Sequence, residues 1–92
     1  ATDAPSGPKI IRECLDIAEM LIKKNISYGD SALSPIRIFS QADNQEQIKI
    51  RIDDKINRIK NGSGFAGDND IDDMIGYLIL LKIAKKLAIS VD

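Results

Sequence analysis

The sequence contains no histidine and a single cysteine, Cys14, among its 92 residues. Without histidine, a His-based catalytic triad, a histidine general base and a Cys₂His₂ zinc site are all excluded. One cysteine excludes an intrachain disulfide and a Cys₄ metal cluster, and it fits a reducing compartment. The side chains that remain for chemistry are carboxylates, Lys, Arg, Tyr, Ser and Asn, and this set suits magnesium and phosphate.

An excess of charge of either sign is also missing, because 13 basic and 14 acidic residues leave a net charge of −1. This balance argues against a protein that binds duplex DNA or RNA, since such proteins carry a basic excess. The longest apolar stretch, Met74 to Leu81, is too short to span a bilayer, and the polar N-terminus is unlike a signal peptide. We therefore expect a soluble cytoplasmic protein with no membrane partner.

Aromatic residues make up only 4% of the chain, whereas isoleucine occurs 17 times. A small core of this kind, without aromatics, a disulfide or a structural metal, is marginal for a lone monomer. We therefore expect a homo-oligomer, either a dimer or a larger assembly.

Apolar residues recur at helical spacing in three segments, which predicts an all-α bundle of three main helices. We expect a disordered arm over 1–7 and a single helical domain over 8–92. The first helix is predicted over 8–25, with Ser6 as its cap. Its wide apolar face includes Ile11, Leu15, Ala18 and Ile22, and Cys14 lies beside them and is expected in the core.

The second helix is predicted over 44–61, between an Asp43–Glu46 capping box and the stop signal Asn61-Gly62. The third is expected to start after a cap at Asp68 or Asn69 and to run to about Ala88. It is apolar nearly all round, which is typical of a helix buried centrally or at a subunit interface.

Two connecting segments carry weaker patterns. Between the first two helices, Ser34-Pro35 favours a short helical turn with Ile36, Ile38 and Phe39, although the alternation of these residues also fits a short strand. The Gly-rich segment over 62–67 lacks the GxxxxGK[ST] pattern of a phosphate loop, so we interpret it as a flexible connector.

Acidic residues crowd the start of the third helix. Asp70, Asp73 and Tyr77 share one face, because they are spaced at i, i+3 and i+7. Two carboxylates one turn apart can hold a hard divalent cation, with water and a substrate phosphate completing its shell. The alternative is that these acids merely favour the N-terminal end of the helix dipole.

Basic side chains gather in two further places. On the second helix, Arg51, Lys55 and Arg58 surround Asp54 and could clamp phosphates, although ordinary ion pairs along a helix give the same pattern. After the first helix, Lys24, Tyr28 and Ser31 flank a turn at Gly29. Such a turn can present backbone N–H groups and a hydroxyl to a phosphate, and Tyr28 can stack on a base.

Taken together, these groups resemble a known family. The ordered set Lys24-x-x-x-Tyr28-Gly29, Arg51-x-x-Asp54-Lys55-x-x-Arg58-Ile59 and Asp70-x-x-Asp73-x-x-Gly76-Tyr77 resembles small phage and prophage proteins of the nucleotide-modification-associated type. These proteins are similar in turn to MazG-like all-α nucleoside triphosphate pyrophosphatases. The resemblance covers about residues 12–88.

This resemblance implies an all-helical oligomer that splits a nucleotide into a monophosphate and pyrophosphate with Mg²⁺ or Mn²⁺. In that superfamily an ExxE pair and an ExxD pair bind the metals. Asp70-x-x-Asp73 matches the second pair with Asp in place of Glu. The first pair is absent in its usual form, since the second helix has Asp54 followed by Lys55 and Arg58.

Our first hypothesis is therefore a phage-type, Mg²⁺- or Mn²⁺-dependent pyrophosphatase for a (deoxy)nucleoside triphosphate, located in the host cytoplasm. The predicted catalytic and metal-binding residues are Asp54, Asp70 and Asp73. The predicted nucleotide- or phosphate-binding residues are Lys24, Tyr28, Ser31, Arg51, Lys55, Arg58 and Tyr77.

The alternative hypothesis is a non-catalytic protein that sequesters nucleotide second messengers of host anti-phage immunity, either cyclic or of the ADP-ribose type. The missing ExxE pair favours this alternative. A third hypothesis is a protein-interaction bundle whose apolar third helix docks a partner.

Overall fold

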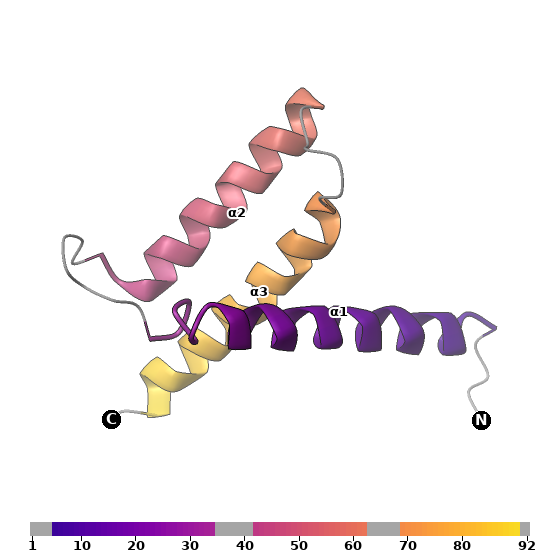
Figure 1. Cartoon of the computed structure of the whole chain (residues 1–92), viewed down its shortest axis with the longest axis horizontal. Coiled ribbons are helices and arrows are strands. Elements are labelled where there is room, and N and C mark those ends of the chain that lie inside the picture. The colour runs from indigo at the N-terminus through magenta and orange to yellow at the C-terminus, as the bar shows by residue number, and fades with distance from the viewer. Residues whose placement is uncertain (1–4, 35–41, 63–68, 91–92) are drawn as a thin grey trace.

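A computed structural model of the chain describes residues 5–34, 42–62 and 69–90. Within these ranges the chain forms three helices and no strand: α1 (Gly7–Ser27), α2 (Asn44–Asn61) and α3 (Asp70–Ser90). Helices α2 and α3 lie side by side and antiparallel (Figure 1). The C-terminal part of α1 crosses α3 (Figure 1). The predicted all-α fold is confirmed, and the homo-oligomer stays a prediction.

Helix α1 is longer than expected at both ends, starting one residue before Pro8 and ending two residues after Asn25. Ser6 occupies the N-cap position, but its side chain makes no capping hydrogen bond, so that prediction is wrong. The reason is its helical backbone (φ −89°, ψ −1°), since a capping hydroxyl needs an extended residue to reach the following N–H groups. Residues 1–4 of the predicted arm lie outside the described residues.

The ends of α2 follow the sequence signals closely. Asp43 Oδ1 accepts a hydrogen bond from the Gln45 N–H at 3.3 Å. Glu46 does not reach back to Asp43 but accepts from Lys49 at 3.2 Å, so only half of the capping box forms. At the other end Gly62 adopts φ +64°, and its N–H donates to the Ile59 carbonyl at 3.3 Å. This left-handed residue is the expected glycine stop.

Helix α3 is capped by Asn69, whose Oδ1 accepts from the Asp72 N–H at 3.1 Å. The helix runs to Ser90, two residues beyond the expected end. The alternative cap Asp68, the helical turn or strand around Ile36 and most of the connector over 62–67 lie outside the described part of the chain.

The core is small, because only four apolar residues are buried among those described: Ile17, Ile48, Leu80 and Ala84. Ile48 of α2 packs with Leu80 and Ala84 of α3. Helix α1 approaches α3 at Gly76, where a Cβ atom would lie 3.2 Å from Leu21 Cδ1. This close approach leaves room for at most a small side chain at position 76.

Cys14 is exposed, so the expectation that it lies in the core is wrong. It belongs to the N-terminal half of α1, which projects beyond α3 (Figure 1). No helix within the described residues is both long enough and apolar enough to cross a membrane.

Candidate functional site

Asp70 and Asp73, two of the three carboxylates predicted as metal ligands, lie in a group of ion pairs at the start of α3. Lys55 of α2 places its Nζ 3.0 Å from Asp73 Oδ2 and 3.4 Å from Asp70 Oδ1. Lys24 of α1 reaches the other oxygen of Asp73 at 2.7 Å. Arg58 lies farther out, with its Nε 3.9 Å from Asp70 Oδ1. The group therefore joins all three helices.

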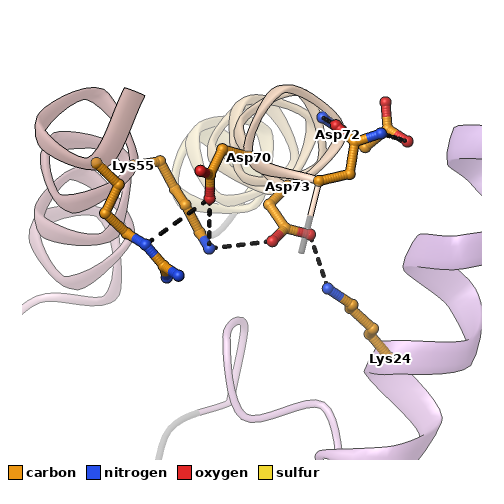
Figure 2. Close-up of polar contacts among 7 residues, drawn as sticks. Lys24, Lys55, Asp70, Asp72 and Asp73 are labelled. Carbon is orange, nitrogen blue, oxygen red and sulfur yellow. Dashed lines mark hydrogen bonds and ion pairs between the residues drawn. The ribbon is translucent and has the colours of Figure 1, made fainter. Parts of the chain in front are cut away.

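Figure 2 shows how these side chains are directed. Lys55 extends between Asp70 and Asp73, and Lys24 approaches Asp73 from the opposite side. Asp72 points away from Lys55, and its carboxylate accepts from Asn69 Nδ2 at 2.9 Å instead. The side chains of Lys55 and Asp73 are 12% and 13% exposed, so this pair is largely shielded from solvent.

The protonation equilibria of the group follow from these contacts. Burial by itself raises the pKa of Asp73, but hydrogen bonds from Lys24 and Lys55 outweigh it and hold that pKa below its ordinary value. Burial likewise lowers the pKa of Lys55, yet its hydrogen bond to Asp73 raises it overall. The hydrogen bond to Asp73 also raises the pKa of Lys24. The charged form of each group is therefore favoured.

Both oxygens of Asp73 and one oxygen of Asp70 are engaged in ion pairs with lysine. The ammonium of Lys55 already lies within 3.4 Å of both carboxylates and supplies the positive charge that a metal would supply. Asp54, the third predicted ligand, is exposed on α2 and takes no part in these ion pairs. No group of three His, Cys, Asp or Glu side chains among the described residues has a spacing that could hold a metal.

A pocket of about 350 Å³ opens beside this group, between α1, the turn that follows it, α2 and α3. Its volume is at the small end of the range for ligand sites. Five of the predicted nucleotide-binding residues line it: Lys24, Tyr28, Ser31, Arg51 and Tyr77. The remaining lining residues are Leu21, Asn25, Ala32, Gln47, Ile48 and Leu80.

The turn after α1 positions two of these residues. Gly29 and Asp30 both adopt φ +61°, a conformation that glycine accepts freely and aspartate tolerates. The chain thereby reverses direction and places Tyr28 and Ser31 at the pocket. The N–H groups of residues 28–31 all donate to backbone carbonyls, at 2.9 to 3.3 Å. The expectation that they face a phosphate is therefore wrong, and Ser31 offers only its side chain.

The basic residues of α2 are divided between the pocket and the ion pairs at the start of α3. Arg51 lines the pocket, whereas Lys55 and Arg58, one and two turns later, pair with the α3 carboxylates. Within the described chain Arg51 has no ion pair. Four cations were predicted to bind phosphate, Lys24, Arg51, Lys55 and Arg58, and the structure brings two of them, Lys24 and Arg51, to the pocket.

Two polar residues of the pocket were missed in the sequence. Gln47 lies one turn before Arg51 on the same face of α2, and Asn25 lies one turn before Tyr28. Helical spacing from the charged and aromatic residues would have found both. The Nε2 of Gln47 donates a hydrogen bond to the Ala42 carbonyl at 2.7 Å. This bond fixes the orientation of the Gln47 amide.

The site thus combines one guanidinium, one ammonium, two tyrosines and an apolar floor, a set of groups that suits a small anionic molecule with a flat ring. Comparison of the chain with protein-family models, with curated proteins and with solved structures found no match.

Proposed function

We propose that this protein binds a nucleotide in the pocket between α1, α2 and α3, without a divalent metal and without cleaving it. One observation carries the proposal: cations and tyrosines from three separate helical segments converge on one cavity. Arg51 comes from α2, Tyr77 from α3, and Lys24 from α1.

Each group has a role in such binding. Arg51 supplies a forked set of N–H donors, which matches the oxygens of a phosphate. Lys24 supplies a second positive charge to the lining of the same pocket. Tyr28 and Tyr77 offer flat faces for a base, and the apolar residues Ile48 and Leu80 form part of the floor.

Binding without turnover is favoured over pyrophosphate release by the ion pairs of Lys55. A metal-dependent pyrophosphatase needs carboxylates that are available to the metal. Here Asp70 and Asp73 share the ammonium of Lys55, and Asp73 pairs with Lys24 as well. These ion pairs support binding without turnover, because a metal would have to displace the lysines from Asp70 and Asp73.

The biological role that fits binding without cleavage is sequestration of a nucleotide signal. We place this ligand among the cyclic and ADP-ribose-type second messengers of host anti-phage immunity, in accord with the resemblance to phage proteins. The binding form is a homo-oligomer in the cytoplasm, because four buried apolar residues make a small core for an independent chain.

The experiment is a calorimetric titration in excess EDTA with a panel of nucleoside triphosphates, cyclic dinucleotides, ADP-ribose and cyclic ADP-ribose. We expect at least one ligand to bind and to be recovered unchanged after heat denaturation of the complex. No binding by any member of the panel would contradict the proposal. Release of pyrophosphate from a triphosphate in the presence of Mg²⁺ would restore the pyrophosphatase hypothesis.

A further inference from the structure

The apolar face of α1 is divided in the structure. Ile17 and Leu21 turn toward the rest of the molecule, where Ile17 is 5% exposed. A second stripe on the same helix is exposed: Ile11, Leu15 and Ile22 are 55%, 57% and 59% exposed, and Ala18 between them is exposed as well. An exposed stripe of this length is unusual for a monomer.

The spacing of this stripe is that of a helix–helix seam. Ile11, Leu15, Ala18 and Ile22 follow one another at intervals of four, three and four residues, which is the alternation that places knobs into holes on a facing helix. The pattern reads the same from either end. It therefore complements itself when two copies of the helix run antiparallel.

The surface of the chain is larger than a folded monomer needs. Its accessible area is 7208 Å². A monomeric protein of this mass exposes about 5,300 Å² by the usual scaling. The difference exceeds the roughly 800 Å² that each partner buries in a standard interface, although large apolar side chains on all three helices contribute to it. The radius of gyration, 15.4 Å, is likewise greater than the value of about 12 Å for a compact chain of this length.

We infer that the stripe Ile11, Leu15, Ala18 and Ile22 is the contact with a second copy of this chain, with the two α1 helices antiparallel. In that pairing Leu15 of each copy faces Ala18 of the other, so a large residue meets a small one. Ile11 faces Ile22 in the same way. The contact is isologous and closes as a dimer. This inference rests on the proposed homo-oligomer and identifies the surface through which its subunits meet.

The charges beside the stripe complement the same orientation. Arg12 and Glu19 lie on one flank of it, seven residues apart, and have opposite sign. When the helices run antiparallel, equivalent flanks face each other, so Arg12 of one copy approaches Glu19 of its partner twice by symmetry. Within one chain these side chains make only exposed pairs, Arg12 with Asp16 at 3.2 Å and Glu19 with Lys23 at 3.5 Å.

The test is sedimentation of the full chain and of two variants over a dilution series. We expect twice the chain mass for the unchanged protein. We expect Leu15→Glu to raise the dimer dissociation constant by about a hundredfold or more, because each dimer must bury two carboxylates. The matched control is Ile89→Glu, at an apolar position that is 75% exposed on α3, and it changes the constant by less than about twofold.

Retention of the dimer by Leu15→Glu, or its loss in Ile89→Glu, would overturn this inference and leave the homo-oligomer open to another surface. If the unchanged protein is a monomer at every concentration, both this inference and the proposed homo-oligomer are overturned. Circular dichroism of Leu15→Glu shows whether the variant keeps its helix content, which distinguishes dissociation from unfolding. Nucleotide titration of the same variant shows whether the pocket still binds its ligand, which tests the proposed function separately from the interface.

The orientation is tested by reversing the flanking charges. Arg12→Glu and Glu19→Arg each raise the dimer dissociation constant by about two- to fivefold, because like charges then face each other. The double variant returns it toward the original value. A double variant weaker than both single variants would overturn the antiparallel arrangement.

Discussion

Lys24 of α1 holds Asp73 of α3 at 2.7 Å, and the same lysine lines the pocket. One ammonium therefore connects the crossing of two helices with the candidate ligand site. A phosphate in the pocket competes with Asp73 for Lys24. For this reason we expect the stability of the α1–α3 contact and the affinity for an anionic ligand to depend on each other.

Asp73→Asn tests how much this carboxylate contributes to the free energy of unfolding. The substitution keeps the shape of the side chain but removes the charge that Lys55 and Lys24 share. Because Lys55 is largely shielded, we expect the free energy of unfolding to fall by about 2–3 kcal/mol in urea denaturation. The control is Asp54→Asn on exposed α2 surface, with an expected change within about 0.5 kcal/mol. Equal losses in both variants would contradict this account of the ion pairs.

The same ion pairs predict how stability depends on pH. The lowered pKa of Asp73 gives a contribution that is fully present above about pH 4 and is lost as the pH falls through the folded pKa. The raised pKa values of Lys24 and Lys55 give a contribution that is present below about pH 10 and is lost as the pH rises through theirs. Stability should therefore be highest between these limits.

Urea denaturation at a series of pH values measures this dependence. Asp73→Asn should flatten the acid side of the profile, because the group whose pKa differs between the folded and unfolded chain is then missing. An acid side as steep in Asp73→Asn as in the unchanged protein would contradict the assignment.

Arg51 is the cation that we expect to anchor the ligand, since it lines the pocket and has no ion pair in the described chain. Arg51→Ala should weaken nucleotide binding by about tenfold or more, because a charge-assisted hydrogen bond contributes about 1.5–3 kcal/mol. The melting temperature should hardly change, since the side chain is exposed. Lys60→Ala, at an exposed cation on the same helix, is the control, and an equal loss of affinity there would indicate nonspecific attraction.

Gly76 tests the close crossing of α1 and α3. A Leu side chain there would collide with Leu21, so Gly76→Leu should lower the free energy of unfolding by about 1–3 kcal/mol. Gly76→Ala should change it little, because the Cβ contact at 3.2 Å is offset by the helix propensity of alanine, about 1 kcal/mol better than glycine. Thermal denaturation of both variants measures the difference, and greater stability of Gly76→Leu would contradict the close packing.

Local signals in the sequence were sufficient for the helices. The Asp43 cap and the Gly62 stop are settled by residues within one turn, and both are found in the structure. Ser6 was predicted wrongly because its backbone conformation, which decides whether a hydroxyl can cap, is not encoded in residue type alone. Cys14 was misplaced because helical spacing identifies an apolar face without saying how far the neighbouring helix extends along it.

Part of the pocket lining could be predicted from the sequence, but the ion pairs beside the pocket could not. Periodicity placed Arg51, Lys55 and Arg58 on one face of α2, and it could not say which of them would meet α3. The answer depends on the register between α2 and α3, which brings Lys55 to Asp70 and Asp73 and leaves Arg51 at the pocket. Long-range register is set by packing around Ile48 and Leu80, beyond the reach of local patterns.

The central claim is metal-independent binding of an intact nucleotide. Its most direct test is a pair of calorimetric titrations with the tightest ligand of the panel, one in excess EDTA and one in excess Mg²⁺. We predict the same dissociation constant and the same stoichiometry in both, with the ligand recovered unchanged. Binding that disappears in EDTA, or a ligand recovered as monophosphate and pyrophosphate after incubation with Mg²⁺, would contradict the account.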